Sequence, residues 1–489
     1  MKQKIIFSIL FLLLMNFSSA QKQKISLTLK DAIQLGKEKG LQAQINTNTF
    51  YAGQYQFKSQ AANLLPNFSI TGNLPGINRS FNSITQPDGT IQFVQQSQAL
   101  SNATLNINQQ ITATGGSVYF SSVLNRFDVL GNGASTNWQS APVLVGINQP
   151  IFRFNQYKFD WKIAQLYNKQ NTRSYAEKME DLSAEIVQKF FDVVIARIAL
   201  EQERFNINVN DTLLRVARGR YNLGKIGEDD LLQTELRLMN AQNNFDQATL
   251  NYNVNENQLK ILLGLDKNFD LNLIPEAVIP NFEPDVDKAM SEAKKNRSDI
   301  LSIEISQKQT EANLKRASYN RLPNATLNAS YGLNQTSPIL SDAYKSPLDQ
   351  QRATVGLNIP LMNWGKYRFD YRTAKYQMNA QQAQLDLQKL NIELEVINQI
   401  GLYLQLRKRL ASSGKADTIA QKRYSVAKNR YLIGSGTITI TDLNFAQNDK
   451  DAARKDYYAT MSQFWLAYYH LRRLTLYDFE KDEVLFKQN

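Results

Sequence analysis

The chain contains no cysteine and a single histidine, His470. Without cysteine, a disulfide framework, a thiolate metal site and lipid attachment to cysteine are all excluded. With one histidine, Ser/His, Cys/His and zinc arrangements lack their parts. His470 sits among aromatic residues of a predicted helix, which indicates a packed or interfacial side chain. Composition does not exclude a pair of catalytic carboxylates, but no apolar pocket for one is evident. We expect no catalytic, cofactor-binding or metal-binding residue.

Long apolar runs are also missing. The longest one, Ile5–Met15, follows Lys2 and Lys4 and precedes small residues that end at Ala20. This arrangement is typical of a secretory signal peptide, so we predict that residues 1–20 are removed. No later stretch has 18 consecutive apolar residues, and we therefore expect no transmembrane helix in the mature chain.

Basic residues outnumber acidic residues, 56 to 44. The 489 residues carry a formal charge of +12, and loss of Lys2 and Lys4 with the signal peptide leaves +10. A basic chain invites a nucleic-acid interpretation. However, the lysines and arginines are spread along predicted helix faces in an exported protein. We therefore expect solvated helix faces and no nucleic-acid partner.

Proline is confined to three regions. All twelve prolines lie within 66–150, 275–284 and 323–360. The proline-free tracts 151–274 and 361–489 are therefore predicted to be helical. Apolar residues recur there at a spacing of three to four, which is typical of coiled-coil-like helices. The first tract shows this spacing at Leu182, Ile186, Phe190, Val193 and Leu200.

The proline-containing regions show a different pattern. Residues 324–334 alternate between apolar and polar side chains, which predicts a strand with one apolar face. Eleven residues is about the length that a tilted strand needs to cross a bilayer. Residues 103–112 and 117–124 resemble a further hairpin. Only helices and closed barrels satisfy their backbone in lipid, so these strands favour a barrel. Candidates for an aromatic belt at its ends are Trp138, Phe152, Tyr331 and Trp364, although ordinary packing explains each of them equally well.

The chain repeats itself. Leu65-Pro66-Asn67 recurs 257 residues later as Leu322-Pro323-Asn324, and Val145–Pro150 resembles the segment 210 residues later. These displacements predict two structural repeats, the first of which has about 47 extra residues between Pro66 and Pro150. We expect a first repeat at 21–274 with strands within 66–150 and a helical hairpin at 153–264, a linker at 275–286, and a second repeat at 287–489 with strands within 323–361 and a hairpin at 365–475.

Two near-copies interrupt the helical tracts. RYNLGKIGEDDLL spans Arg220–Leu232, and RYLIGSGTITITDL spans Arg430–Leu443. Glycine ends helices by adopting a left-handed conformation, so each segment is predicted to be the turn of a helical hairpin. Acidic residues favour the first turn of the helix that follows, where they cap N–H groups and meet the helix dipole.

This order of segments resembles the TolC family of outer-membrane efflux channels. The resemblance rests on Leu27–Ile33 as an opening helix, on Leu-Pro-Asn at both helix-to-strand junctions, on Asn148-Gln149-Pro150 and Asn358-Ile359-Pro360 at the strand-to-helix junctions, and on the two tips. It implies an α+β membrane protein that forms a homotrimer, with a shared β-barrel and a long periplasmic α-helical barrel. We expect twelve strands, four per protomer; if the 103–124 hairpin joins the wall, the count becomes eighteen.

The resemblance also implies a function. The protein would be a passive exit duct in the outer membrane, contacting outer-membrane lipid, a periplasmic adaptor protein and an inner-membrane transporter of the RND or ABC type. A trimeric adhesin or structural protein is one alternative, and the alternation at 324–334 argues against it. The adaptor protein itself is another, but adaptors usually have one helical hairpin and lack paired transmembrane strands.

Site residues follow from the tips. In a trimer, three copies of each tip would surround one axis, where grouped carboxylates attract cations. The expected periplasmic gate comprises Arg220, Tyr221, Asp229, Asp230, Arg430, Tyr431 and Asp442. The expected adaptor-docking residues are Leu223, Gly224, Lys225, Ile226, Ile433, Gly434, Ser435 and Gly436.

The second tip departs from the family pattern. Gly224 precedes Asp230 by six residues, whereas Gly434 precedes Asp442 by eight, so the second tip is predicted to be two residues longer. Phe445 stands where the family often has a further aspartate. The ring from this repeat should therefore carry fewer charges.

Overall fold

The structure is a computed structural model that describes residues 23–131, 133–275, 278–433 and 440–486, without the side chains of Gln23, 431–433 and Ile440. The predicted signal peptide lies outside these residues. The chain forms two compact units, which are described separately. Unit 1 consists of residues up to Tyr51, Thr172–Ile300 and Leu390 onwards, and unit 2 of Ala52–Asn171 and Leu301–Lys389.

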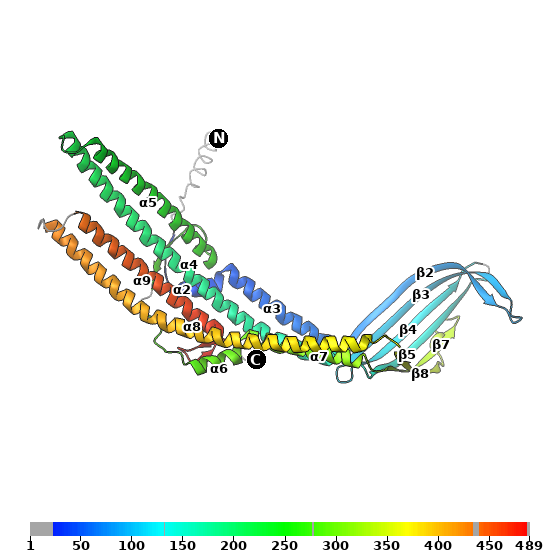
Figure 1. Cartoon of the computed structure of the whole chain (residues 1–489). Coiled ribbons are helices and arrows are strands. Elements are labelled where there is room, and N and C mark those ends of the chain that lie inside the picture. Colours follow the sequence, from blue (N-terminus) through cyan, green and yellow to red (C-terminus); the bar gives the residue numbers. More distant parts are fainter. Residues whose placement is uncertain (1–22, 132, 276–277, 434–439, 487–489) are drawn as a thin grey trace, which may run out of the picture. The chain divides into compact units, whose positions relative to one another are not determined.

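Helices and strands alternate in blocks along the chain (Figure 1). In order they are β1 (Gln23–Thr28), α2 (Leu29–Lys39), α3 (Leu41–Ala62), β2 (Asn67–Thr85), β3 (Ile91–Ile111), β4 (Gly116–Val129), β5 (Ser135–Ile151), α4 (Gln156–Asn222), α5 (Glu228–Leu263), β6 (Phe269–Ile274), α6 (Val286–Asn296), α7 (Ser298–Tyr319), β7 (Asn324–Ser337), η1 (Asp342–Tyr344), β8 (Leu348–Asn358), α8 (Lys366–Ile433), α9 (Ile440–Thr475), β9 (Tyr477–Asp478) and β10 (Glu483–Val484). No helix among the described residues is both long and apolar enough to span a membrane.

The proline-free tracts form long helices, as the sequence predicts. The helix α4 has 67 residues and α8 has 68, and each is followed by a 36-residue helix, α5 or α9. Segments of this length reflect the absence of proline, which would remove a backbone donor and clash with the preceding turn.

The shorter helices come in pairs, α2 with α3 and α6 with α7, and each pair is separated by a short break. The break lies at Gly40 (φ −60°, ψ 140°) and at Arg297 (φ −61°, ψ 142°), where the backbone is extended. A Cβ atom at Gly40 would lie 2.6 Å from the carbonyl oxygen of Leu262 in α5. The buried guanidinium of Arg297 instead pairs with Glu395 (2.7 Å) and Asp299 (2.6 Å). Tertiary contacts therefore accompany both breaks, which the proline pattern could not reveal.

Element bounds in the two halves of the chain share one displacement. The helices α6 and α7 begin and end 257 residues after α2 and α3, and β7 begins 257 residues after β2. The two leading helices are also capped alike. Thr28 accepts a hydrogen bond from the Asp31 amide, and Asp285 accepts one from the Lys288 amide. The same local chemistry thus starts equivalent helices.

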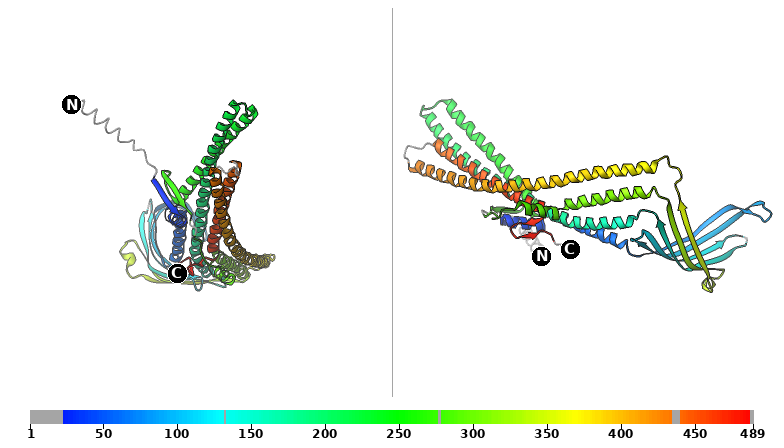
Figure 2. Two further views of the ribbon diagram at one scale, coloured as in Figure 1. Left: turned by 90° about the vertical axis from the view of Figure 1, so that its left-hand side faces the viewer. Right: turned by 60° about the horizontal axis from the view of Figure 1, so that its bottom comes forward.

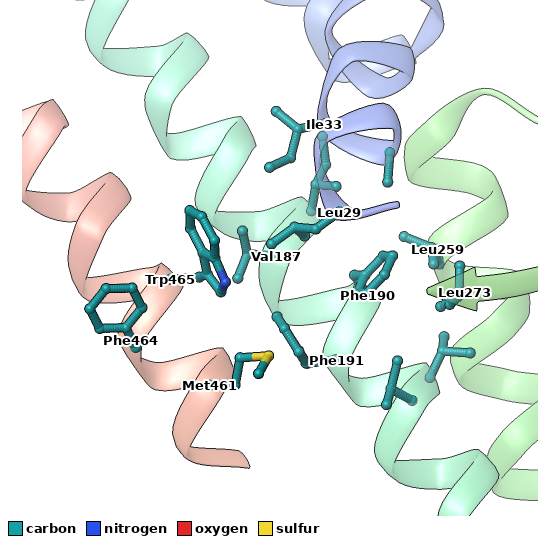
Figure 3. Packing of buried hydrophobic residues seen from close by; sticks show 14 of the residues in the cluster. Leu29, Ile33, Val187, Phe190, Phe191, Leu259, Leu273, Met461, Phe464 and Trp465 are labelled. Carbon is teal, nitrogen blue, oxygen red and sulfur yellow. The ribbon is translucent and has the colours of Figure 1, made fainter. Parts of the chain in front are cut away.

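The core of unit 1 is a cluster of aliphatic and aromatic side chains around the middle of α4 (Figure 3). Leu182, Ile186, Phe190 and Val193 are buried there, as their spacing predicts, whereas Leu200 is only partly buried. Side chains of α2, α5, β6 and α9 pack against them. In Figure 3, Phe190 lies towards Leu259 and Leu273, and Phe191 towards Met461.

Charged side chains surround this core. Arg472 of α9 donates to Glu180 of α4 (2.7 Å) and to Asp478 of β9, and Lys37 of α2 also pairs with Glu180 (3.0 Å). Because Glu180 is buried and shared by two cations, the network ties three helices and the C-terminal segment together. His470, expected to be packed or interfacial, is exposed on α9 in the single chain.

In unit 2, one sheet contains six strands in the order β2-β3-β4-β5-β7-β8, all neighbours being antiparallel. The expectation of four strands per chain is therefore wrong. The 103–124 hairpin, which we left open, joins the sheet as parts of β3 and β4. The sheet is curved and does not close on itself, so β2 and β8 are its edges (Figures 1 and 2).

The extra residues of the first repeat form the β3–β4 hairpin and the outer part of β2 and β3. The pairing of β3 with β4 ends at Gln98 and Val129, but the pairing of β2 with β3 continues to Thr85 and Ile91. This outer part carries side-chain amide hydrogen bonds, such as Gln86 to Gln92 (2.5 Å). The insertion thus widens and lengthens the sheet.

The half-buried carboxylate of Glu177 in unit 1 allows a test by pH. Glu177 of α4 accepts a hydrogen bond from the amide of Ser298, the first residue of α7 (2.8 Å). Burial raises the pKa of Glu177 above its usual value, although hydrogen bonds from Ser298 partly offset this. Because the folded state then binds the proton more tightly than the unfolded state, this group stabilises the fold below its unfolded pKa, and the contribution is lost as pH rises.

Replacing Glu177 by Gln should therefore cost more stability at pH 4 than at pH 7. Thermal unfolding of the two proteins at both pH values measures the difference. Glu304→Gln, at an exposed position of α7, is the control and should show no such trend. An equal cost at both pH values for Glu177→Gln would contradict the raised pKa.

Candidate functional site

The first predicted tip is a tight turn between α4 and α5. Two backbone hydrogen bonds close it: the Gly224 amide donates to the Tyr221 carbonyl (2.8 Å), and the Lys225 amide donates to the Arg220 carbonyl (2.9 Å). Gly224 has φ +68°. This is the Schellman arrangement, in which a left-handed residue lets two later amides satisfy the last carbonyls of a helix. The Arg-Tyr-x-x-Gly spacing therefore has a backbone reason.

The acidic residues of this tip occupy the first turn of α5. Glu228, Asp229 and Asp230 are its first three residues, and all three are exposed. We expected the aspartates to cap the helix, but the capping position is Gly227, which has no side chain and makes no side-chain capping bond. The carboxylates instead lie where the positive end of the helix dipole stabilises them.

Other side chains of this tip are exposed on the surface of the chain. Leu223 is 72% exposed and Tyr221 is 40% exposed. Among the residues that the structure describes, the side chains of Arg220 and Tyr221 have no hydrogen-bonding partner. Arg218 pairs with Glu235 across the two helices (3.6 Å). Within one chain, therefore, the tip is held by its backbone and by one exposed ion pair, and its expected gate residues are not brought together.

The second tip is described only at its flanks. Gly434, Ser435 and Gly436 lie outside the described residues, as do the side chains of Tyr431 and Ile433. Asp442 is the third residue of α9, as Asp230 is of α5. Arg430 is exposed near the end of α8, and Phe445 is 61% exposed. The flanking helices pack through a small cluster of Ala427, Leu443, Ala446 and Tyr424.

A second functional surface lies in unit 2, where the register of the strands separates two faces. Successive strand residues point to opposite sides, and the pairings align these sides across the sheet. One side, the apolar face, carries Phe68, Ile70, Leu105, Ile107, Val118, Phe120, Leu124, Val143, Val145, Ile147, Leu327, Ala329, Tyr331, Leu333, Ala353, Val355 and Leu357. Many of these side chains are exposed, including Ile70 at 80%. A surface of this kind has to be covered by something other than water.

The opposite side, the polar face, carries mainly amides, hydroxyls and glycines, with a few apolar residues such as Leu100, Val123 and Leu144. It includes Asn67, Ser69, Thr71, Thr104, Asn106, Asn108, Ser117, Tyr119, Ser121, Asn148, Thr326, Asn328, Ser330 and Thr354. Some of the amides pair across strands, as Asn148 donates to Asn328 (2.6 Å). Alternation at 324–334 predicted the two faces for one strand, and the register extends them to all six.

Charged and aromatic residues gather where the apolar face ends. On that face, Arg126 pairs with Asp128 (2.9 Å) and lies over the Trp138 ring, 5.3 Å from its centroid. At the other end of the strands, Phe152 and Trp364 have positive φ values of 58° and 51° and are 61% and 85% exposed. A left-handed bulky residue is uncommon and usually has a reason. Their positions at both strand-to-helix junctions suit an interfacial aromatic belt.

Nothing in the described part of the chain gathers three or more metal-ligating side chains. The described residues instead form a two-sided sheet and an exposed helical turn.

A family model matches part of the chain in sequence, and solved structures match its fold. Residues 289–475 match the family model described as outer membrane efflux protein. No curated protein matches the chain by sequence. The solved CmeC outer membrane channel of Campylobacter jejuni is 15% identical with a TM-score of 0.61, and the match covers 91% of this chain and 85% of that one.

Two further solved structures give similar values. The outer membrane protein VceC from Vibrio cholerae is 13% identical, with a TM-score of 0.61 over 91% of this chain and 95% of that one. The MtrE outer membrane channel of Neisseria gonorrhoeae, in an open state, is 16% identical, with a TM-score of 0.56 over 91% and 88%. The chain therefore has the fold of these channels.

The turn at Gly224 can be tested with a matched glycine. Gly224→Ala forces a Cβ into the left-handed region and should cost about 1 to 2 kcal/mol. Gly219→Ala, five residues earlier in α4 and with open space around its Cβ position, should instead stabilise the helix by about 0.5 to 1 kcal/mol. Hydrogen exchange of the last turn of α4 measures both effects. The same sign for both variants would contradict the turn geometry.

The polar face can be tested at Gly146. A Cβ added there would overlap the ring of Tyr119 on the facing strand. Gly146→Ala should therefore destabilise the sheet, and adding Tyr119→Ser should relieve the overlap. Thermal unfolding of the single and double variants measures this coupling. Gly356→Ala, which meets only one atom at 3.9 Å, is the control. Strict additivity of the two changes would exclude the contact.

Proposed function

We propose that the protein is the outer-membrane exit duct of an efflux or secretion system. Residues 289–475 match the model of the outer membrane efflux protein family, and this match is the premise of the proposal. Substrates would be expelled by an inner-membrane transporter of the RND or ABC type and pass through a periplasmic adaptor into the duct. The duct itself would conduct them passively and perform no chemistry.

The two-faced open sheet is the observation that carries this proposal. Its apolar face suits lipid, and its polar face suits a water-filled interior. Its edges β2 and β8 present backbone groups that no other strand of the described residues satisfies. Such groups cost several kcal/mol each in a bilayer. Closure by other copies of the chain, β8 of one against β2 of the next, would satisfy them.

The number of copies follows from the family resemblance. A homotrimer of this six-stranded sheet would make a barrel of eighteen strands, instead of the twelve that we expected from sequence. In this assembly the paired helices α4, α5, α8 and α9 would continue the duct into the periplasm. The corresponding bounds of α2 with α6 and of α3 with α7 support two structural repeats per chain.

The tips would serve as gate and docking site. Asp230 and Asp442 hold the same third position of their helices, so a trimer would present two sets of three such carboxylates. Grouped negative charges attract cations. The exposed turn Leu223–Ile226 would meet the helical hairpin of the adaptor, and its Arg220, Tyr221 and Asp229 neighbours would contact adjacent helices in the closed state.

An adhesin or structural trimer is the competing function. It would need the helices but would not need a polar face opposite an apolar one across six strands. The adaptor is disfavoured because the chain has two long helical hairpins and a six-stranded sheet that is apolar on one side.

Conductance of the purified protein in planar bilayers tests the duct and the gate together. The wild type should conduct, and Asp230→Ala with Asp442→Ala should raise the conductance or weaken block by divalent cations. Asp246→Ala, at an exposed position in the body of α5, is the matched control. Absence of any conductance would overturn the duct, and an unaltered double variant would overturn the gate alone.

Photo-crosslinking in cells tests the docking site. A crosslinker at Leu223 should capture a periplasmic adaptor protein because this side chain projects from the turn. A crosslinker at Leu250, which is 57% exposed in the body of α5, should not. Capture of the adaptor from Leu250 but not from Leu223 would place docking elsewhere.

A further inference from the structure

Charged residues are scarce in the six-stranded sheet and unequally divided between its faces. The strands β2, β3, β4, β5, β7 and β8 contain five charged residues: Arg79, Arg126, Asp128, Asp349 and Arg352. The register places the first four on the apolar face. Arg352 is therefore the one charged residue that these strands direct to the polar face.

The surroundings of Arg352 contain no carboxylate on the same face. Arg352 of β8 is paired with Ser330 of β7, which is paired with Gly146 of β5, and Gly146 is paired with Tyr119 of β4. The next partners in this row are Asn108 and Asn67. Arg352 is exposed, and the described residues provide it with no ion pair. Its charge is thus not compensated locally.

The connections between strands add little charge. The turn between β2 and β3 contains Asp88, whose carboxylate accepts hydrogen bonds from the amide (3.0 Å) and hydroxyl (2.7 Å) of Thr90. The connection between β7 and β8 contains Asp342 and Lys345, which pair with each other (2.7 Å). Residues 130–134 between β4 and β5 contain no charged residue. Along the strands themselves, Arg352 remains the single fixed charge of the polar face.

We propose that Arg352 sets the charge selectivity of the barrel segment, which would pass neutral and anionic polar solutes more readily than cations. The inference rests on the proposed function, because it takes the polar face as the wall of the duct. Each copy would contribute one guanidinium to an interior otherwise lined by uncharged residues. A fixed charge of one sign raises the local concentration of mobile ions of the opposite sign.

The absence of cysteine allows a direct test of this charge. Arg352→Cys introduces the only thiol of the chain, which can be modified during a bilayer recording by a cationic or an anionic methanethiosulfonate reagent. The cationic reagent should restore the chloride-to-potassium permeability ratio of the wild type, and the anionic one should lower it. Between the two, we expect about a twofold change or more at 0.1 M salt, where the screening length is about 10 Å.

Neighbouring and conservative variants provide the controls. Gln351→Cys lies one residue away on the opposite face, so reagents in the duct should leave its currents unchanged. Arg352→Lys keeps the charge and should keep the permeability ratio. Raising the salt to 1 M shortens the screening length to about 3 Å and should shrink every difference.

The outcomes separate this inference from the proposed function. If the wild type conducts but modified Arg352→Cys keeps one permeability ratio with both reagents, the role of Arg352 is overturned and the duct stands. If Gln351→Cys responds and Arg352→Cys does not, the assignment of the two faces is overturned. If the wild type does not conduct, the proposed duct fails first.

Discussion

Unpaired backbone groups at the two edges of the sheet are the constraint on which the rest of the structure depends. The strands β2 and β8 end the sheet, and no further strand in the described part of the chain pairs with either of them. A sheet that is apolar on one side cannot leave such edges open in lipid. In the duct that we propose, other copies of the chain would pair with these edges, and the exposed apolar face would contact lipid.

In the helical part, the placement of proline and glycine determines where each helix continues and where it ends. Proline is absent from the two long tracts, so the helices continue until glycine ends them in the left-handed conformation, as Gly224 does. The carboxylates that follow lie at the start of the next helix, where the dipole already favours them. Position alone therefore explains Asp229 and Asp230 within one chain. A gating role requires the additional premise that three copies approach one axis.

The two units differ in how many charged side chains they contain and in how these are paired. Unit 1 buries charged groups in a network around Glu180 and Arg472, where each charge has a partner. Breaking such a pair is costly because it leaves an isolated charge in a region of low polarity. The sheet of unit 2 has almost no charge, and Arg352 is the only charged residue that its strands place on the polar face. In the duct that we propose, a wall with so few charges would hydrogen-bond to water without holding any one ion strongly.

The resemblance to outer-membrane efflux channels, inferred from motifs along the chain, is confirmed at residues 289–475 by the family model, and solved channels share the fold of the chain. The location of the long helices and the two faces of β7 could be predicted from the sequence, because the placement of proline and the period of apolar side chains are local properties. The helix breaks at Gly40 and Arg297 could not be predicted in this way, because they involve contacts with segments that are distant in the sequence.

The number of strands in the sheet could not be predicted from the sequence either. Whether the hairpin at 103–124 stood apart or joined the sheet depended on hydrogen bonds between β3 and both of its neighbours, which no local pattern records. The sequence by itself determined where the chain is helical, where it turns and which strand residues are apolar. Only the tertiary structure decided that six strands share one register, because strand pairing joins segments that are far apart in the chain. Because of that register, Arg352 is the only charged residue of these strands that lies on the polar face.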